Sequence, residues 1–450
     1  MKPIPKRPLI PIITDLLEYR QAANNTIPYT KKLIEKYGDV CEASFTGIKN
    51  YFIHDPEVIK EILTTQSPKM KRTYLFRAFR KFLGHGLFTS DGDYHKRQRR
   101  LIKPAFYPQR IEEYANIMVA CANEEVDTWQ DGDTININQA MTRITLKVIT
   151  KTLFGSGLEN DAIETFGKDL AEAFRVMNAI LINPLYTYCL VNEIKIPIVK
   201  NFFRLRAKVD VVINNVIASY RKEEHSGKMD LLTMLMEAKD EETNDHMTDE
   251  QIRDEVITFF IAGHETTTLA LTWTLYLLGK NPEIENKFHE EIKTTIQGRL
   301  PEAADYQSLH LTKNIFKESL RLYPPAWTFA RETMEDVTIR DYHFPKGSVL
   351  WTITYLVHHD EKYFHHPEAF IPSRWDEETI KDLPKYAYFP FGGGNRMCIG
   401  EGFAWMEGIL VLTTIASRFR LQLPADFSTE ICPLFSLKTK HQVLMKAIKS

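Results

Sequence analysis

The chain has 450 residues, of which 44% are hydrophobic, so it can bury a large core as one domain or as two tightly joined lobes. Its formal net charge of -2 at pH 7 provides no overall field that would favour nucleic acid as a partner. The five cysteines are scattered without a C-x-x-C pair, which argues against zinc and iron–sulfur sites and is typical of a reducing compartment.

The N-terminal stretch Met1–Pro8 is interrupted by prolines and charged residues. Such a stretch is a poor signal peptide and a poor membrane anchor, so we expect a cytoplasmic protein without a transmembrane segment. Residues 39–54 are expected to form a hairpin that turns at Gly47–Asn50, and a helix should follow from about Asp55.

Helical patterns then dominate from about residue 55 to about residue 322, with a polar break at Glu223–Lys228. A second β-rich region is expected over about residues 326–390, where residues 336–340 and 349–354 flank the turn Phe344–Gly347. The last long helix should run from about Cys398 to Arg418, and a short strand region should close the chain. Because the middle is helical and the sheets are small, the pattern predicts a mainly α fold in a single domain over residues 1–450.

The longest predicted helix begins at a capping box, Thr248–Gln251, and ends at the stop signal Gly279–Pro282. Its length of about 30 residues corresponds to roughly 45 Å. It is apolar on almost all sides, so it should be buried. A membrane span fits this length, but the polar run His264–Thr268 at its midpoint would be costly in lipid.

The polar centre of this helix reads Ala262-Gly-His-Glu-Thr-Thr267. Threonines in a core helix often bond back to their own carbonyl groups, which explains the hydroxyls but not the carboxylate of Glu265. An acid and an alcohol beside two small residues suit proton delivery to a bound oxygen ligand. In this interpretation Glu265 relays protons, Thr266 donates a hydrogen bond, and Ala262 and Gly263 permit close approach.

The segment Phe391-Gly-Gly-Gly-Asn-Arg-Met-Cys398-Ile-Gly400 is a glycine-rich loop that delivers one cysteine to a following helix. A helix start favours the thiolate, which can bind a haem iron. Phe391 can shield the sulfur from water, and Arg396 is placed to meet a haem propionate. The alternative is a glycine-rich turn that holds a buried, inert cysteine.

This loop resembles the haem-ligand loop of the cytochrome P450 family, and every fixed position of Phe-x-x-Gly-x-Arg-x-Cys-x-Gly is filled. The central helix is similar to that of the family's monooxygenases. Glu318 and Arg321 resemble the Glu-x-x-Arg pair of the family's structural triad, which Arg374 completes. On its own such an i,i+3 pair is more often a surface ion pair.

The resemblance covers about residues 30–446 and implies the cytochrome P450 fold, in which the long central helix crosses a haem b held against the helix of the cysteine loop. It implies Cys398 as the axial ligand of the iron, and Thr266 and Glu265 as the residues that deliver protons. The other implied cofactor-binding residues are His95, Arg99, Arg331 and Arg396 at the propionates, with Phe391, Ala262 and Gly263. The implied substrate pocket is lined by Phe76, Phe88, Phe259, Ala262, Trp327 and Leu434.

The resemblance implies a monooxygenase that uses O2 and NAD(P)H-derived electrons to hydroxylate or epoxidise a hydrophobic substrate. Because the chain shows no flavin or ferredoxin domain, we expect the electrons to come from a ferredoxin or flavodoxin with its reductase. A basic stripe on the predicted helix, formed by Lys96, Arg100 and Lys103, is either a docking surface for that acidic partner or an ordinary solvated face.

Long-chain fatty acids and terpenoids, including carotenoids, remain open as substrates. Lys49 or Tyr51 could meet a fatty-acid carboxylate, although a plain hairpin turn is the favoured interpretation. The histidine pairs His358-His359 and His365-His366 are interpreted as surface residues. The alternative functions are a haem-based sensor or ligand-binding protein, and a peroxide-driven peroxygenase; the intact Glu265-Thr266 pair argues against the peroxygenase.

Overall fold

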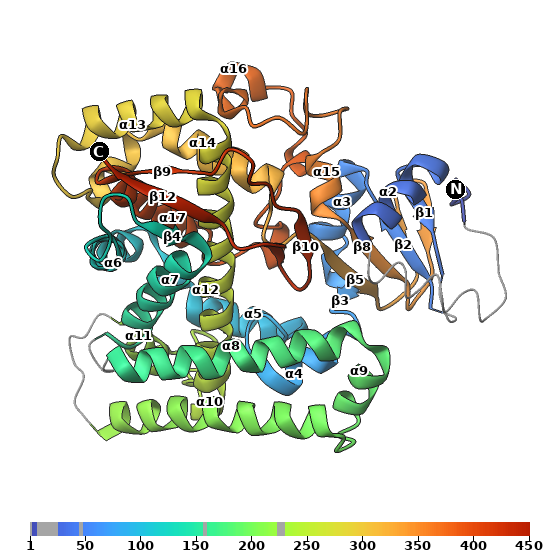
Figure 1. Cartoon of the computed structure of the whole chain (residues 1–450). Helices are drawn as coiled ribbons and strands as arrows, with labels where there is room; N and C mark the ends of the chain where they lie inside the picture. The colour runs from blue at the N-terminus through green and yellow to red at the C-terminus, as the bar shows by residue number, and fades with distance from the viewer. Residues whose placement is uncertain (1, 7–25, 45–47, 156–159, 223–229) are drawn as a thin grey trace. The chain divides into compact units, whose positions relative to one another are not determined.

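The computed structural model describes residues 2–6, 26–44, 48–155, 160–222 and 230–450 (Figure 1). The predicted turn residue Gly47 and the predicted break Glu223–Lys228 lie outside these residues. Packing divides the chain into two units, each built from segments that are separated in sequence. We call Met1–Leu75, Lys317–Cys398 and Ile431–Lys438 the sheet unit, and Phe76–Phe316, Ile399–Glu430 and Thr439–Ser450 the helix unit.

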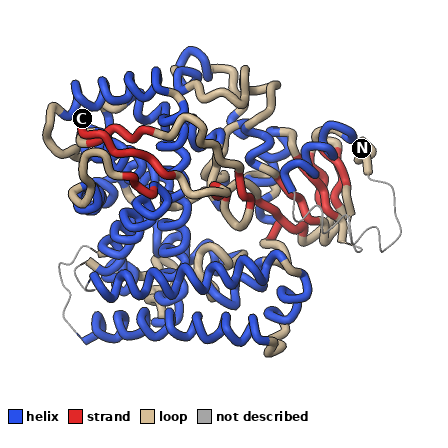
Figure 2. The backbone as a smooth tube through the Cα atoms, viewed as in Figure 1, coloured by secondary structure: helices blue, strands red, loops and turns tan. Residues whose placement is uncertain are grey.

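The sheet unit contains a five-stranded sheet with the order β1-β2-β8-β5-β3 (Figure 2). The parallel pair β2–β8 aligns Tyr51 with Leu350, and the other neighbours are antiparallel. The strands of this sheet are β1 Val40–Glu42, β2 Asn50–Ile53, β3 Met70–Lys71, β5 Phe329–Thr333 and β8 Val349–Thr352. Two small hairpins are formed by β6 Val337–Ile339 with β7 Tyr342–Phe344, and by β10 Ile431–Pro433 with β11 Leu437–Thr439.

Short helices accompany this sheet: α2 Thr26–Tyr37, α3 Pro56–Leu63, α15 Thr354–His358 and α16 Glu377–Ile380. Helix α3 begins where predicted, because Asp55 caps it by accepting the amide N–H of Glu57 at 2.8 Å. Its apolar face, including Val58 and Ile62, is buried with Tyr51 of β2 in the main core of the unit.

The predicted turn at residues 344–347 does not connect the two predicted strands. Instead β6 turns back through Arg340, whose φ of 51° is left-handed, and pairs with β7, while β8 joins the large sheet. The turn at Arg340 between β6 and β7 contains no glycine or proline, so the sequence does not signal it.

The helix unit is dominated by α12, Asp249–Lys280, a 32-residue helix with the predicted capping box at Thr248 (Figure 1). Helices α8 and α10 run side by side in the same unit. The other helices are α4 Phe76–Leu83, α5 Gly92–Ile102, α6 Pro108–Val126, α7 Ile137–Phe154, α8 Asn160–Ile182, α9 Pro184–Val191, α10 Pro197–Lys222, α11 Leu231–Glu237, α13 Pro282–Ile296 and α17 Glu401–Ala416. Helix α14, His310–Leu322, continues from the helix unit into the sheet unit.

A three-stranded antiparallel sheet, β4-β12-β9, completes the helix unit; its strands are β4 Thr134–Asn136, β9 Phe419–Gln422 and β12 Leu444–Lys449. The predicted mainly α fold class with small sheets is confirmed. The last long helix begins at Glu401 rather than at Cys398. Among the described residues, no helix is long and apolar enough to cross a membrane.

Helix α17 is buried along most of its length and carries one carboxyl group, Glu407, into the core of the helix unit. Neither carboxyl oxygen has a hydrogen-bonding partner in good geometry among the described residues. Burial raises the pKa of Glu407 to about 8, although the Thr267 hydroxyl favours the charged form. Folding therefore keeps this carboxyl protonated at neutral pH.

The buried acid predicts a pH-dependent loss of stability that Glu407→Gln removes. The folded-state pKa lies above the unfolded one, so the wild type loses stability as the pH rises from the ordinary range of glutamate to about 8. We expect the variant to gain about 1.4 kcal/mol per pH unit relative to wild type across this window, and nothing below it. Thermal unfolding at pH 5 and pH 8 measures the difference. Glu283→Gln, on the exposed face of α13, is the control and should show no such gain.

Candidate functional site

The glycine-rich loop of the sheet unit presents Cys398 at the protein surface. Of the five cysteines, Cys398 is the exposed one, whereas Cys41, Cys121 and Cys189 are buried. The Cys398 amide N–H donates to the Phe391 carbonyl oxygen at 2.9 Å, which closes the loop. Cys398 lies two residues before Gly400, the N-cap of α17, so the sulfur precedes the first helical turn instead of lying within it.

One glycine of this loop, Gly394, is required by the close approach of the loop to α3. Gly394 has a left-handed φ of 63°, and an added Cβ would overlap the carbonyl oxygen of Leu63. The hydroxyl of Ser67, buried just beyond α3, donates to Asn395 Oδ1 at 2.8 Å. Backbone contact on one side and a hydrogen bond on the other fix the loop that carries the thiol.

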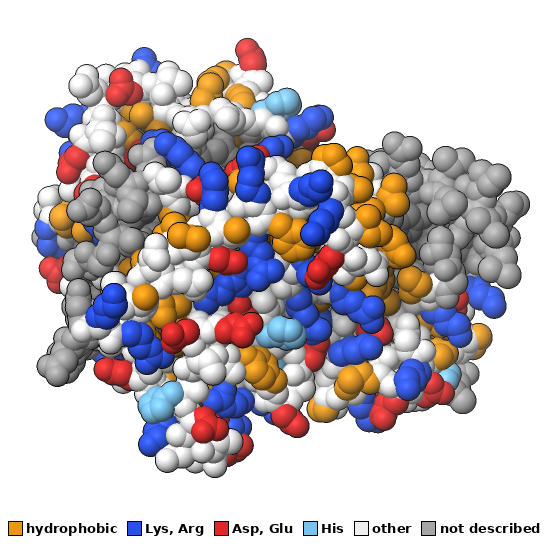
Figure 3. Space-filling model, turned by 90° about the horizontal axis from the view of Figure 1, so that it is seen from below, with side chains coloured by type: hydrophobic (Ala, Val, Ile, Leu, Met, Phe, Trp, Pro, Cys, Tyr) orange, Lys and Arg blue, Asp and Glu red, His pale blue; other side chains and the backbone are white. Residues whose placement is uncertain are grey.

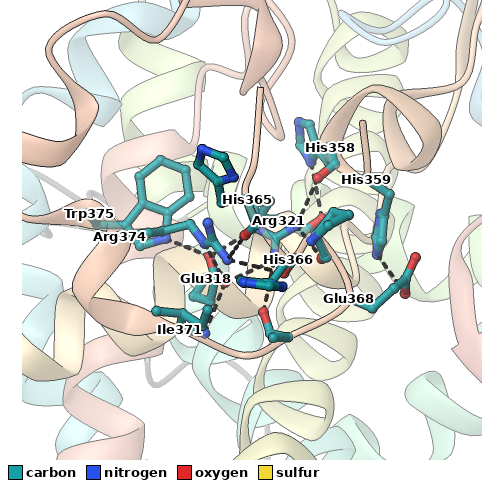
Figure 4. A network of polar contacts seen from close by, with 12 residues as sticks. Glu318, Arg321, His358, His359, His365, His366, Glu368, Ile371, Arg374 and Trp375 are labelled. Carbon is teal, nitrogen blue, oxygen red and sulfur yellow. Dashed lines mark hydrogen bonds and ion pairs between the residues drawn. The ribbon is translucent and has the colours of Figure 1, made fainter. Parts of the chain in front are cut away.

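A second part of the sheet unit centres on the fully buried carboxylate of Glu318 on α14 (Figure 4). Arg321 donates to both of its oxygens, at 2.9 Å and 2.8 Å, and Arg374 Nε donates to Oε1 at 2.9 Å. The indole of Trp375 donates to Oε2 at 2.9 Å and the Ile371 amide donates to Oε1 at 3.1 Å. The structure thus brings together the three residues of the predicted triad and adds Trp375, which the sequence did not single out.

The remaining donors of Arg321 bind carbonyl groups of the segment that follows α15. They reach the carbonyl oxygens of His358 and Pro367 at 2.8 Å and that of Ala369 at 3.2 Å. The Arg374 guanidinium binds the carbonyl oxygen of His365 at 3.0 Å. One buried carboxylate therefore organises two guanidinium groups, which hold this irregular segment by its backbone.

The interpretation of the first histidine pair as surface residues is wrong. His358 is fully buried; its Nε2 accepts the Phe389 amide N–H at 3.0 Å, and its Nδ1 lies 3.3 Å from the Arg321 carbonyl oxygen. Burial lowers the pKa of His358 well below its ordinary value, and lowers that of His359 to about 3. The neutral His358 links Arg321 to Phe389, two residues before Phe391. His365 and His366, by contrast, are exposed as predicted.

In the helix unit, α12 is buried over Ile252–Ile261 and again over Thr267–Leu278, but it is accessible between these stretches. Ala262 is exposed, and Gly263 and Glu265 are half-buried. Thr266 Oγ1 donates back to the Ala262 carbonyl oxygen at 2.5 Å. To donate to a ligand, the Thr266 hydroxyl has to exchange this partner. The small residues and the acid–alcohol pair therefore coincide with the accessible stretch between the two buried parts of this helix.

The predicted propionate ligands are divided between the units. In the helix unit, His95 is buried and Arg99 is half-buried, one turn apart on α5. In the sheet unit, Arg331 is buried on β5, where its guanidinium lies 5.4 Å from the centre of the Phe329 ring, and Arg396 is half-buried before Cys398. Each unit thus contains two of the four candidates.

The basic stripe on α5 is largely paired within the chain. Lys96 lies 2.8 Å from Asp93, and Arg100 lies 3.2 Å from Asp240 and 2.8 Å from Glu242. Side chains of both charges are interspersed on the face drawn in Figure 3. These pairings reduce the positive charge that the stripe offers to an acidic partner.

The predicted pocket residues also fall into two groups. In the helix unit, the rings of Phe76 and Phe88 lie 5.2 Å apart and both contact Phe79, whereas Phe259 is buried against Phe106. In the sheet unit, the Trp327 indole donates to the Leu434 carbonyl oxygen at 2.9 Å. Phe259 therefore has a core contact, and its role as a pocket residue remains a prediction.

Tyr51 is not placed to bind a carboxylate at a surface opening. It is 3% exposed, and its ring meets Phe344 edge-on at 5.1 Å in the core of the sheet unit. Burial raises the pKa of the Tyr51 hydroxyl to about 12. Lys49 is exposed. The neutral, buried phenol removes one of the two sequence candidates for a fatty-acid anchor.

These residues fit a haem group in their chemistry. An exposed thiol on a loop without side chains at Gly392–Gly394 provides a soft axial donor that a flat macrocycle can approach. In the helix unit, the accessible Ala262–Gly263 stretch is likewise without bulky side chains. Arg99 in the helix unit and Arg331 and Arg396 in the sheet unit are cations of the kind that bind carboxylates such as haem propionates, and His95 is a further candidate donor.

Comparison with known proteins gives one consistent family. A sequence profile of the family described as Cytochrome P450 matches residues 4–445. Cyclooctatin synthase of Streptomyces melanosporofaciens is 34% identical over 86% of this chain and 83% of its own. Pentalenene oxygenase of Streptomyces avermitilis is 29% identical over 87% and 86%, respectively. The crystal structure of the cytochrome P450DA heme domain superposes with a TM-score of 0.88 at 25% identity, covering 100% of this chain and 98% of that chain.

The Glu318 network predicts that Glu318→Gln is strongly destabilising. The amide leaves two guanidinium groups, one of them fully buried, without their counter-charge, which costs about 3–5 kcal/mol. Thermal unfolding and haem content of the purified protein measure the effect. Glu368→Gln is the matched control, since Glu368 is 77% exposed and 3.8 Å from the neutral His359. Equal unfolding temperatures for the two variants would contradict the central role of Glu318.

Proposed function

The chain belongs to the cytochrome P450 family and is a haem-dependent monooxygenase. We propose that it hydroxylates a neutral, hydrophobic terpenoid. The observation that carries the proposal is the similarity over most of both chains to enzymes that are named for terpenoid oxidation. Cyclooctat-9-en-7-ol 5-monooxygenase is 30% identical over 86% of this chain, and pentalenene oxygenase is of comparable similarity.

The side chains of the chain suit such a substrate. The half-buried rings of Phe76 and Phe88 form an aromatic surface with Phe79 that can pack against a ring system. Tyr51 is buried in the core of the sheet unit, so it cannot bind the carboxylate of a fatty acid. A long-chain fatty acid is therefore the less favoured substrate, and a carotenoid remains within the terpenoid class.

We assign Cys398 as the axial ligand of haem b, and His95, Arg99, Arg331 and Arg396 as the residues that bind its propionates. When bound, the haem supplies the iron centre that activates O2 for insertion of one oxygen atom into a C–H bond. Phe391, whose carbonyl accepts the Cys398 amide, limits water at the sulfur. Ala262 and Gly263, which lack bulky side chains, would leave room for O2 beside α12.

Glu265 and Thr266 deliver protons in this proposal. The half-buried Glu265 carboxylate would take up a proton from solvent, and the Thr266 hydroxyl would donate a hydrogen bond on the reacting side of α12 once it leaves the Ala262 carbonyl. Electrons come from NAD(P)H through a separate ferredoxin or flavodoxin with its reductase. Because Lys96 and Arg100 are paired within the chain, an acidic partner has to compete with their carboxylates.

Optical titration of the purified protein tests the substrate class. Cyclic terpenes are expected to give a saturable shift of the haem from low spin to high spin as they displace the water ligand of the iron. Straight-chain fatty acids with the same number of carbons are the matched control and should give no saturable shift. A shift with the fatty acids alone would contradict the terpenoid proposal. Product formation with surrogate redox partners separates an enzyme from a haem-based sensor.

Thr266→Ala tests the proton-delivery assignment. Without the hydroxyl, electrons should still be consumed, but the hydroxylated product per NAD(P)H should fall about tenfold while hydrogen peroxide rises, because general acid catalysis is lost. Thr266→Ser keeps the hydroxyl and should keep the coupling. Full, tightly coupled product formation by the alanine variant would sink the assignment.

A further inference from the structure

Two neighbouring carboxyl groups of α12, Asp254 and Glu255, are buried in the helix unit and have no part in the site described above. Glu255 is completely buried and Asp254 is 4% exposed. Both bind the segment Gly84–Thr89, which connects α4 to the residues before α5. This segment carries Phe88, one of the three aromatic residues of the cluster with Phe76 and Phe79.

The carboxyl groups hold this segment by its backbone. Glu255 Oε2 accepts the Leu87 amide N–H at 2.9 Å, and Asp254 Oδ2 accepts the His85 amide N–H at 2.7 Å. The other oxygen of Glu255 accepts the Gln98 side-chain amide on α5 at 3.0 Å. The bond to Leu87 is adjacent to Phe88 in the chain, so it fixes the backbone from which that ring projects.

The segment lies against α12 too closely for other residues. Gly84 has a left-handed φ of 64°, and a Cβ added there would overlap the Asp254 carboxylate. A Cβ added at Gly86 would overlap the Thr258 hydroxyl, one helical turn after Asp254. From the other side, Arg80 on α4 donates to the Thr89 carbonyl oxygen at 2.8 Å. The segment is thus fixed at both ends and in its middle.

Glu255 lies on the same face of α12 as the accessible stretch. Ala262 follows it by seven residues and Thr266 by eleven, which are close to whole numbers of turns at 3.6 residues per turn. The rise of 1.5 Å per residue places Ala262 about 10 Å along the helix from Glu255. The segment bound by Glu255 therefore lies on the helix face that, further along α12, carries Ala262 and Thr266.

We propose that Glu255 is a positioning residue that sets the placement of Phe88 over the substrate side of α12 and that releases the segment when it is protonated. The role toward substrate rests on the proposed function, whereas the attachment of the segment does not. An ionised carboxylate is the stronger acceptor for the Leu87 and Gln98 donors. Protonation of Glu255 therefore weakens both bonds together.

The environment of Glu255 places the protonation of its carboxylate near neutral pH. Burial raises the pKa of Glu255 to about 7, against the hydrogen bonds from Leu87 and Gln98. The charged or titratable groups around it are Asp254 and Arg253 on α12, Tyr94 and Arg97 on α5, and His85 on the segment, whose side chain is exposed. Arg253 is committed to Asp254 at 2.6 Å and to Asp210 on α10 at 2.8 Å, so it gives Glu255 no direct ion pair.

Hydrogen exchange of the haem-loaded protein without substrate tests the attachment. In the wild type, we expect the protection factor of the Leu87 amide to rise about fivefold from pH 6 to pH 8, after correction for intrinsic exchange. Glu255→Gln should abolish this pH dependence. Gln98→Met, which removes one donor that favours the charged form, should shift its midpoint to higher pH. Glu250→Gln, the same change at an exposed position of α12, is the control and should behave as wild type.

A second measurement tests the role toward ligands without using a substrate. Glu255→Gln should weaken the binding of 4-phenylimidazole about threefold, because the proposal places Phe88 where the phenyl ring would pack, and should leave imidazole unchanged. Unchanged Leu87 protection in both Glu255→Gln and Gln98→Met would overturn the attachment. Altered protection with unchanged 4-phenylimidazole affinity would overturn the positioning role. Because neither probe is a terpenoid, failure of the substrate assignment would leave both results intact and is recognised separately in the spin-state titration.

Discussion

The carboxylate of Glu318 accepts hydrogen bonds from α14, from the residues after Phe370 and from the Trp375 indole, all in a region from which water is excluded. A buried carboxylate and two guanidinium groups are unfavourable unless every donor and acceptor is satisfied. Here the arginines complete their hydrogen bonding on backbone carbonyls of an irregular segment. The segment therefore has one arrangement, and through His358 and Phe389 this arrangement extends toward the loop that bears Cys398. These contacts support the segment that leads into the loop with the exposed thiol.

In the helix unit, the 32-residue helix α12 is buried along most of its length but has accessible polar groups near its middle. There the small residues Ala262 and Gly263 lie beside Glu265 and Thr266, while the buried stretches on either side anchor the helix. Three further carboxyl groups are buried in this unit. Asp254 and Glu255 belong to α12, and Glu407 of α17 lies beside Thr267 of α12. Each of these acids has a pKa raised by burial, so the helix unit contains several groups whose charge responds to pH.

The sequence predicted those features that depend on local signals. The bounds of α12 follow from a capping box and a Gly-Lys-Asn-Pro stop, and the shape of the cysteine loop follows from its glycines. Glu318 and Arg321 were paired by helical spacing, but Arg374 was added only through family resemblance, because its contact spans more than 50 residues of chain. The polar neighbours of His358 predict a surface position for it, whereas the fold buries it; the carboxylate partners of Arg100 come from a loop that is distant in sequence. Long-range polar contacts of this kind leave no periodic pattern in the sequence, which is also why Glu255 was not singled out.

The central claim is that Cys398 is the thiolate that holds the haem iron. The most direct test is the absorption spectrum of the reduced, carbon monoxide-bound protein, compared between wild type, Cys398→Ser and Cys432→Ser. Cys432 is a partly exposed cysteine of the same unit and serves as the matched control. The account predicts the red-shifted Soret band of a thiolate-ligated haem in the wild type and in Cys432→Ser, and its loss in Cys398→Ser. Retention of that band in Cys398→Ser would contradict the account.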